Sequence, residues 1–149
     1  MRNVLLPVDG SDSAFQATRY VMDFIKQHGP LVVHVVNIQP KPLGWQTHGM
    51  EPEVIDDHLS VQAHIALKPV LQVLHEHGIA CRTHVKLGDT GEALLALADE
   101  LGCDHIIMGS RGLGAISGLM LGSVTRKVLH LAKIPVICVK GDRVDDAPE

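Results

Sequence analysis

Five glycines and a basic side chain are concentrated in one short stretch of the chain, from Met108 to Thr125. Gly122 and Ser123 open a segment with helical spacing, and the first N–H groups of a helix favour an anion. The Ser123 hydroxyl adds a donor, and a role as plain N-cap is a compatible alternative. Arg111 offers a fork of donors beside Gly112, the alternative being an exposed loop arginine. The segment therefore predicts a phosphate site.

Asp9 supplies a carboxylate that is a second candidate for contacting a ligand. Asp9 directly follows the apolar run NVLLPV (3–8), which is typical of a strand buried on both faces. Its oxygens would accept hydrogen bonds from a ribose hydroxyl or an exocyclic amine. The alternative is that Asp9 caps the helix that follows, and the spacing leaves both interpretations open.

Several familiar motifs are missing from the sequence. There is no G-x-x-x-x-G-K-[ST] loop, no serine lies in a G-x-S-x-G elbow, and GLGAISG (112–118) is one residue too long for a dinucleotide fingerprint. The ten histidines include no H-E-x-x-H, and exposed helix and loop histidines explain them better than a zinc site. These absences argue against the common P-loop, dehydrogenase and hydrolase classes, and we assign no catalytic residue and no metal ligand.

The elements that must position these residues alternate between strand and helix. Strands are expected at 3–8, 31–38, 79–87, 104–109 and 134–140, and helices at 11–29, 54–77, 90–101 and 124–133. Strands separated by helices run parallel with right-handed crossovers. The sequence therefore predicts an α/β fold, a single open doubly wound five-stranded parallel sheet with helices on both faces.

Local signals mark the ends and faces of the helices. Ser13 with Gln16 predicts a capping box for the first helix, and Asp89 with Glu92 predicts the cap of the third. Pro69 predicts a kink in the second helix. One side of the last helix is expected to carry Val124, Val128, Leu131 and Ala132.

The position of the site follows from the type of sheet. Ligands of doubly wound sheets bind beyond the carboxyl ends of the strands, where the strand order reverses. If the first and fourth strands are neighbours at that point, PVDGS (7–11) and MGSRG (108–112) meet there. This brings Asp9 to the glycine-rich segment.

Composition limits the classes of protein and partner. The chain has 149 residues, 46% hydrophobic and 20% charged, which suits one domain, expected at 1–143 with a frayed tail at 144–149. A net charge of −4 makes nucleic acid an unfavourable partner. We identify no signal peptide and no membrane span. Three widely spaced cysteines suit small core residues in a reducing cytoplasm.

The chain resembles the universal stress protein family over nearly its whole length. The match rests on G-x-x-G-(nine residues)-G-[ST], present as Gly109, Gly112 and Gly122-Ser123, and on the flanking NVLLPVDGSDSA and VTRKVLHLAKIPVICVK. The full motif marks the branch that binds ATP, ADP or AMP. The resemblance implies a Rossmann-like sheet ordered 3-2-1-4-5 and a homodimer formed through strand 134–140, with Cys138 near the interface. It also implies that the nucleotide contacts Pro7, Val8, Asp9, the backbone of Val35, Met108, Gly109, Arg111, Gly112, Gly122, Ser123 and Val124.

The sequence favours a nucleotide binder over an efficient enzyme. Residues 110–124 contain no Asp, Glu or His to activate water, so we expect a stress-response regulatory or signalling dimer with slow or no hydrolysis. The alternative is an ATP-using enzyme, a weak ATPase or adenylyl transferase, in which Asp9 or Asp12 positions Mg²⁺. A third possibility is a structural or chaperone-like dimer whose apolar glycine loop holds no ligand.

Overall fold

A computed structural model describes residues 1–41, 43–44, 48–111 and 121–141 of the chain. Five strands form one sheet: β1 (Asn3–Pro7), β2 (Val32–Gln39), β3 (Cys81–Leu87), β4 (His105–Gly109) and β5 (Val136–Val139). Every neighbouring pair is parallel, and the order is β3-β2-β1-β4-β5. The predicted fold class and strand order are confirmed, and β1 and β4 are neighbours, so their carboxyl ends meet.

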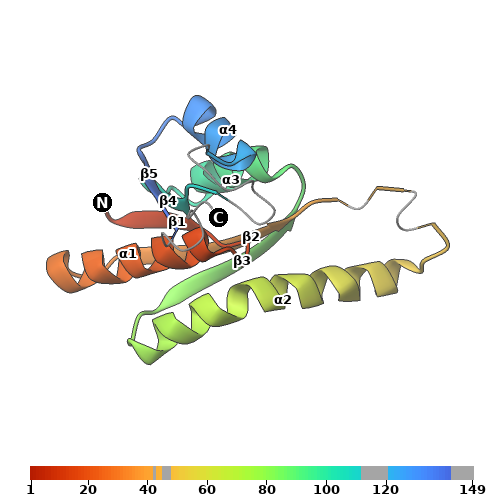
Figure 1. Ribbon diagram of the computed structural model, residues 1–149, viewed down its shortest axis with the longest axis horizontal. Coiled ribbons are helices and arrows are strands. Elements are labelled where there is room, and N and C mark those ends of the chain that lie inside the picture. The colour runs from red at the N-terminus through yellow and green to blue at the C-terminus, as the bar shows by residue number, and fades with distance from the viewer. Residues whose placement is uncertain (42, 45–47, 112–120, 142–149) are drawn as a thin grey trace, which may run out of the picture.

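Within the described residues, four helices cover the two faces of this sheet. They are α1 (Asp12–His28), α2 (Pro52–Glu76), α3 (Thr90–Glu100) and α4 (Ser123–Leu131). Figure 1 shows α1 and α2 on one face and α3 and α4 on the other. In the described chain, no helix is long and apolar enough to cross a membrane.

Alternating side chains of the strands build one core on each face. Val33 and Val35 of β2 pack with α1 and α2, whereas Val36 packs with α3 and α4. The buried strands carry mostly aliphatic residues, as expected for a sheet covered on both sides. Leu131 departs from the expected face of α4, because it is 47% exposed while Val128 is fully buried.

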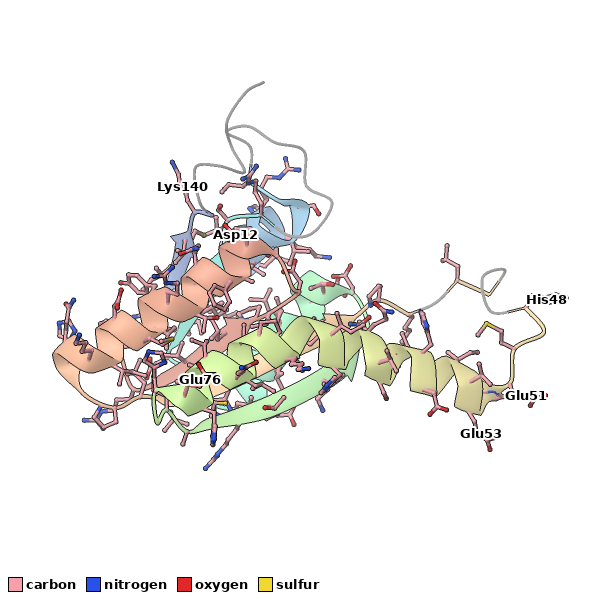
Figure 2. The ribbon with its side chains drawn as sticks, turned by 60° about the horizontal axis from the view of Figure 1, so that its bottom comes forward. Asp12, His48, Glu51, Glu53, Glu76 and Lys140 are labelled. Carbon is pink, nitrogen blue, oxygen red and sulfur yellow. The ribbon has the colours of Figure 1, made fainter. Side chains whose placement is uncertain are left out.

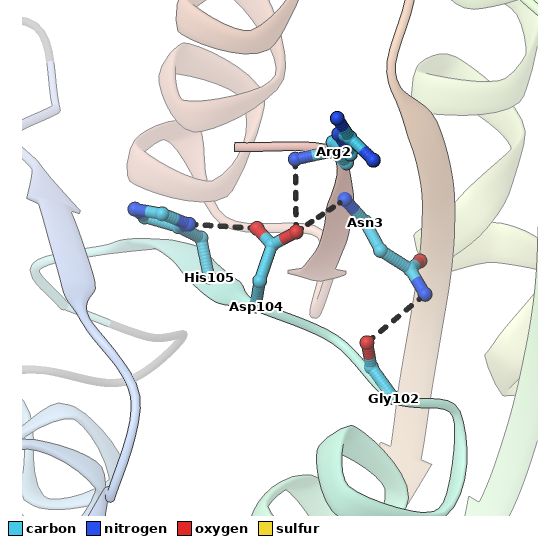
Figure 3. Close-up of polar contacts among 5 residues, drawn as sticks. All are labelled: Arg2, Asn3, Gly102, Asp104 and His105. Atoms are coloured by element: carbon cyan, nitrogen blue, oxygen red, sulfur yellow. Dashed lines mark hydrogen bonds and ion pairs between the residues drawn. The ribbon is translucent and has the colours of Figure 1, made fainter.

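A polar cluster fixes the amino-terminal edge of the sheet (Figure 3). Asp104 accepts hydrogen bonds from the backbone N–H groups of Arg2 and Asn3 at 2.9 and 3.0 Å, and its other oxygen lies 2.7 Å from His105 Nδ1. Asn3 Nδ2 donates to the carbonyl of Gly102 at 3.1 Å. Burial raises the pKa of Asp104, but the hydrogen bonds from His105, Asn3 and Arg2 outweigh it and lower the pKa. The cluster joins the starts of β1 and β4, opposite the carboxyl ends.

The second helix is longer than the predicted segment and extends beyond the sheet. Figure 2 shows Glu51 and Glu53 at its projecting end, while Glu76 lies over the sheet. Pro52 is accommodated in the first turn, where its missing N–H has no helical partner in any case. Pro69 lies inside α2, which continues to Glu76. The middle of α2, from residue 62 to residue 69, lies beside the carboxyl end of β2.

Candidate functional site

A cavity of about 780 Å³ lies at the carboxyl ends of β1, β2 and β4. Its volume is in the range of small-molecule sites, and its place is the one expected from the strand order. The predicted site residues that line it are Pro7, Val8, Asp9, Met108, Gly109, Arg111, Gly122, Ser123 and Val124. Gly112 lies outside the described residues.

Val35 does not belong to the lining of this cavity. Its side chain is fully buried in the core under α1 and α2. The next residue, Val36, lines the cavity instead, and its carbonyl accepts from the backbone N–H of Val8 at 2.8 Å. Because β2 runs on to Gln39, the residues after Val35 reach the cavity. A contact between the Val35 backbone and a nucleotide stays a prediction.

The turn after β1 is built by Asp9, Gly10 and Ser11. Asp9 Oδ1 accepts from the N–H of Ser11 at 2.9 Å, and Gly10 takes a φ of 89°, which favours glycine. Ser11 is the N-cap of α1, since its hydroxyl accepts from the N–H of Ala14 at 3.2 Å. Asp9 therefore shapes the turn and does not cap the helix, which leaves its carboxylate at the wall of the cavity.

The predicted capping box of the first helix is wrong. The cap is Ser11, two residues earlier, and the residue three positions after it is Ala14, whose methyl group cannot accept the hydrogen bond that completes a box. The hydroxyl of Ser13 donates to the carbonyl of Arg111 instead. This bond joins the start of α1 to the segment that follows β4.

The last helix begins directly at the cavity. Gly122 is its N-cap and makes no side-chain cap, and the first intrahelical bond runs from the N–H of Arg126 to the carbonyl of Gly122 at 3.0 Å. The N–H groups of Ser123, Val124 and Thr125 therefore have no intrahelical acceptor, as at any helix start. Ser123 occupies the first helical position and is not the N-cap considered from the sequence.

Two hydrogen bonds hold this helix start against β4. The buried hydroxyl of Thr125 donates to the carbonyl of Gly109 at 3.0 Å, and the N–H of Gly122 donates to the carbonyl of Ser110 at 2.9 Å. The positive end of α4 thus lies beside the end of β4, where an anion would be held by backbone groups and the helix dipole.

A second contact joins α4 to α3, next in the sequence to the lining residues Thr90 and Arg126. Lys127 Nζ lies 3.0 Å from Asp89 Oδ1 and 3.4 Å from Glu92 Oε1. Asp89 is the N-cap of α3, as predicted, and accepts from the N–H of Glu92 at 3.1 Å. The hydrogen bond from Lys127, followed by that from the Glu92 N–H, lowers the pKa of Asp89.

Charge and polarity differ between the two ends of the cavity. Among the described lining residues, the ionisable side chains are Asp9, Arg111 and Arg126. Arg111 follows β4 and Arg126 lies on α4. On the opposite side, β2 and α2 contribute three carboxamides, Asn37, Gln39 and Gln62. The lining is therefore cationic at the α4 end and neutral but hydrogen-bonding at the other.

Few groups in the described part of this lining could carry acid–base chemistry. Asp9 is the only carboxylate there, and the described lining includes no histidine, lysine or cysteine. Asp12 is not a lining residue; its Oδ2 lies beside Gly141, where an added Cβ would be 3.0 Å away. Among the described residues, no group of three or more His, Cys, Asp or Glu is arranged to hold a metal ion.

The sequence matches the profile of the universal stress protein family over residues 1–140. The chain belongs to this family. It is 34% identical to a universal stress protein of Thermus aquaticus, over 93% of this chain and 98% of the relative. The fold is also similar to that of the protein MJ0577, with a TM-score of 0.81, 26% identity and coverage of 95% and 96%.

A further solved member of the family contains a nucleotide. The universal stress protein of Archaeoglobus fulgidus, determined in complex with dAMP, is 25% identical to this chain. Its TM-score is 0.65, and the alignment covers 94% of this chain and 98% of the other.

Proposed function

We propose that this universal stress protein binds an adenine nucleotide, ATP or its products ADP and AMP, in the cavity at the β1–β4 junction. The observation that carries the proposal is the chemical polarity of the lining, with two arginines and a helix start at one end and carboxamides at the other. A nucleotide has the same polarity, because its phosphates are anionic and its base is neutral. The dAMP complex of the Archaeoglobus relative supports the choice of an adenine nucleotide.

Different lining residues would contact the phosphates, the ribose and the base of the proposed ligand. The N–H groups of Ser123 and Val124, with Arg111 and Arg126, would hold the phosphates. Asp9 would accept hydrogen bonds from the ribose hydroxyls, since its carboxylate stands between the two ends at the tip of β1. The base would lie over the carboxyl end of β2, against α2.

Binding is tested by titrating ATP, ADP and AMP into the purified protein and by mass spectrometry of any small molecule it releases. Gly122→Val is the variant that should lose binding, because a branched side chain at the N-cap stands in front of the N–H groups of α4. Its thermal unfolding should stay close to that of the parent. Absence of adenine-nucleotide binding by the parent at millimolar concentration contradicts the proposal.

The role we propose for the bound state is regulatory, with slow or no hydrolysis. The described lining offers one carboxylate and no histidine to activate water, which supports a binder. The second candidate is an ATP-using enzyme, favoured by Asp9, because Mg²⁺ in nucleotide sites often has one or two carboxylate ligands. A turnover above roughly 1 s⁻¹ in the presence of Mg²⁺ decides for the enzyme.

We further propose that two copies pair through β5. This strand is the last in the sheet order. An antiparallel pairing across a two-fold axis would cover both edges at once.

The proposed dimer acts in the reducing cytoplasm, which suits its three free cysteines. Burial, with the charge of Asp104 second, raises the pKa of Cys103 to about 11, as expected for a core residue.

A further inference from the structure

Two carboxamides form a hydrogen-bonded chain at the carboxyl end of β2. Asn37 and Gln39 are two residues apart in the strand, so their side chains lie on the same face of the sheet. Asn37 is 2% exposed, and its Nδ2 donates to the carbonyl of Val8 at 2.8 Å. Gln39 Nε2 in turn donates to Asn37 Oδ1 at 2.7 Å. The chain runs from the backbone at the end of β1 to a side chain in the cavity wall.

These two hydrogen bonds determine which way the amide of Gln39 faces. A backbone carbonyl only accepts hydrogen bonds, so Asn37 must present its NH₂ group to Val8. Its Oδ1 is then the atom left for Gln39, which must present its own NH₂ group in return. The amide of Gln39 is therefore locked against a 180° flip, unlike a carboxamide in solvent.

The locked amide keeps two atoms for a ligand. They are the Oε1 acceptor and the second N–H of Nε2, and within the described part of the chain neither has a hydrogen-bond partner. Gln39 lines the cavity. A planar amide that offers one acceptor and one donor side by side matches the edge of adenine, where the 6-amino donor lies next to a ring-nitrogen acceptor.

The place of Gln39 in the cavity suits the base rather than the phosphates. It belongs to the wall formed by β2 and α2, together with the apolar side chains of Ile65 and Pro69. Arg126 lies on α4, at the cationic end of the cavity. The start of α4 is bonded to the end of β4, and β1 separates β4 from β2 in the sheet. A nucleotide whose phosphates occupy the α4 end therefore brings its base to the carboxamide.

We propose that Gln39 selects the base of the bound nucleotide, accepting a hydrogen bond from the 6-amino group of adenine and donating one to the neighbouring ring nitrogen. Asn37 is a positioning residue that keeps the amide in the required orientation. A 6-oxo purine places a carbonyl oxygen against Oε1, and the locked amide cannot turn to present its donor there. The inference rests on the proposed function and adds discrimination between 6-amino and 6-oxo purines.

The test compares ATP with inosine triphosphate, which differs from it in carrying oxygen in place of the 6-amino group. Titration calorimetry of the parent protein should show ATP bound at least about tenfold more tightly, because a bidentate amide contact discriminates between bases by about that much or more. In Gln39→Leu the ratio should approach one through loss of ATP affinity, with inosine triphosphate affinity retained.

A matched control variant is available on α2. Gln72→Leu removes a carboxamide whose Nε2 donates to Glu76 at 3.0 Å and which does not line the cavity. This variant should keep the full preference for ATP. Thermal unfolding without nucleotide checks that both variants fold. The ratio of the parent protein's affinities for ATP and inosine triphosphate is a test that does not depend on any variant.

The outcomes separate the inference from the proposed function. Equal binding of the two nucleotides by the parent, or an unchanged ratio in folded Gln39→Leu, overturns the inference and leaves nucleotide binding standing. A preference for inosine triphosphate overturns it as well. If neither nucleotide binds at millimolar concentration, both the proposed function and the inference fall.

Discussion

Gly109 and Ser13 lie so close together that a Cβ on Gly109 would be 2.7 Å from the carbonyl carbon of Ser13 and 2.8 Å from the N atom of Ala14. Distances below 3.0 Å to backbone atoms leave no room for a side chain. The first turn of α1 therefore packs directly on the end of β4. The motif glycine at 109 is required by this packing of protein on protein.

Replacing Gly109 with Ala should destabilise the fold, because the added methyl group forces the start of α1 away from β4. Overpacking of this kind costs about 1–3 kcal/mol. Urea denaturation followed by circular dichroism measures the loss. Gly44→Ala is the matched control, since an added Cβ there meets nothing within 4 Å and should change stability little. Equal stability of the two variants contradicts the packing requirement.

Arg126 should contribute to nucleotide affinity through the phosphates alone. We expect Arg126→Gln to weaken ATP binding about tenfold, since a charge-assisted hydrogen bond is lost, and to leave adenosine binding unchanged. The loss should shrink at high salt, where exposed charges are screened. Arg19→Gln on α1, outside the cavity lining, serves as control. An equal loss for adenosine and ATP would place Arg126 elsewhere than at the phosphates.

The fold was predictable because its signals are local and repeated. Apolar runs gave the strands, and residues such as Asp89 and Gly29 marked helix ends where the structure has them. The strand order came from the resemblance and was confirmed, which brought Asp9 and Met108 to one cavity. The site at the carboxyl ends follows from the topology once β1 and β4 are neighbours.

The parts of the site that sequence reasoning missed depend on contacts between distant segments. The role of Ser13 is decided by the carbonyl of Arg111, almost a hundred residues away, and no local pattern reports that bond. The sequence predicts a second strand that ends at residue 38, although β2 continues through Gln39. The alternation from Val35 to Asn37 to Gln39 was the available signal, because polar residues replace apolar ones on one face as the strand reaches the cavity.

The proposed dimer gives a prediction for the edge of the sheet. Pro135 and Val139 direct their carbonyl oxygens to the N–H groups of Ile106 and Ser110 in β4, so alternation points the backbone groups of Cys138 outward. Cys138→Pro should remove an outward donor, leave the pairing with β4 intact and convert the dimer to a monomer. Sedimentation analysis measures the change, with Cys138→Ala as the control that stays dimeric. A dimeric proline variant would contradict pairing through β5.

The pair formed by His34 and His84 should make stability depend on pH. Their ring nitrogens Nδ1 and Nε2 lie 3.0 Å apart, and His34 is 2% exposed. Burial, followed by the positive charges of His84 and Arg82, lowers the pKa of His34 below its ordinary value of 6.5. In the folded protein, His34 therefore takes up its proton at a lower pH than in the unfolded chain.

The sign of the effect follows from proton uptake. Between the lowered pKa and about 6.5 the unfolded chain binds more protons, so the free energy of unfolding falls as the pH drops through this window. Urea denaturation at pH 7.5 and 5.0 should show a smaller difference for His34→Gln than for the parent, whereas His64→Gln, at an exposed site on α2, should keep the parent's difference. An equal pH dependence in all three proteins would rule out His34 as its source.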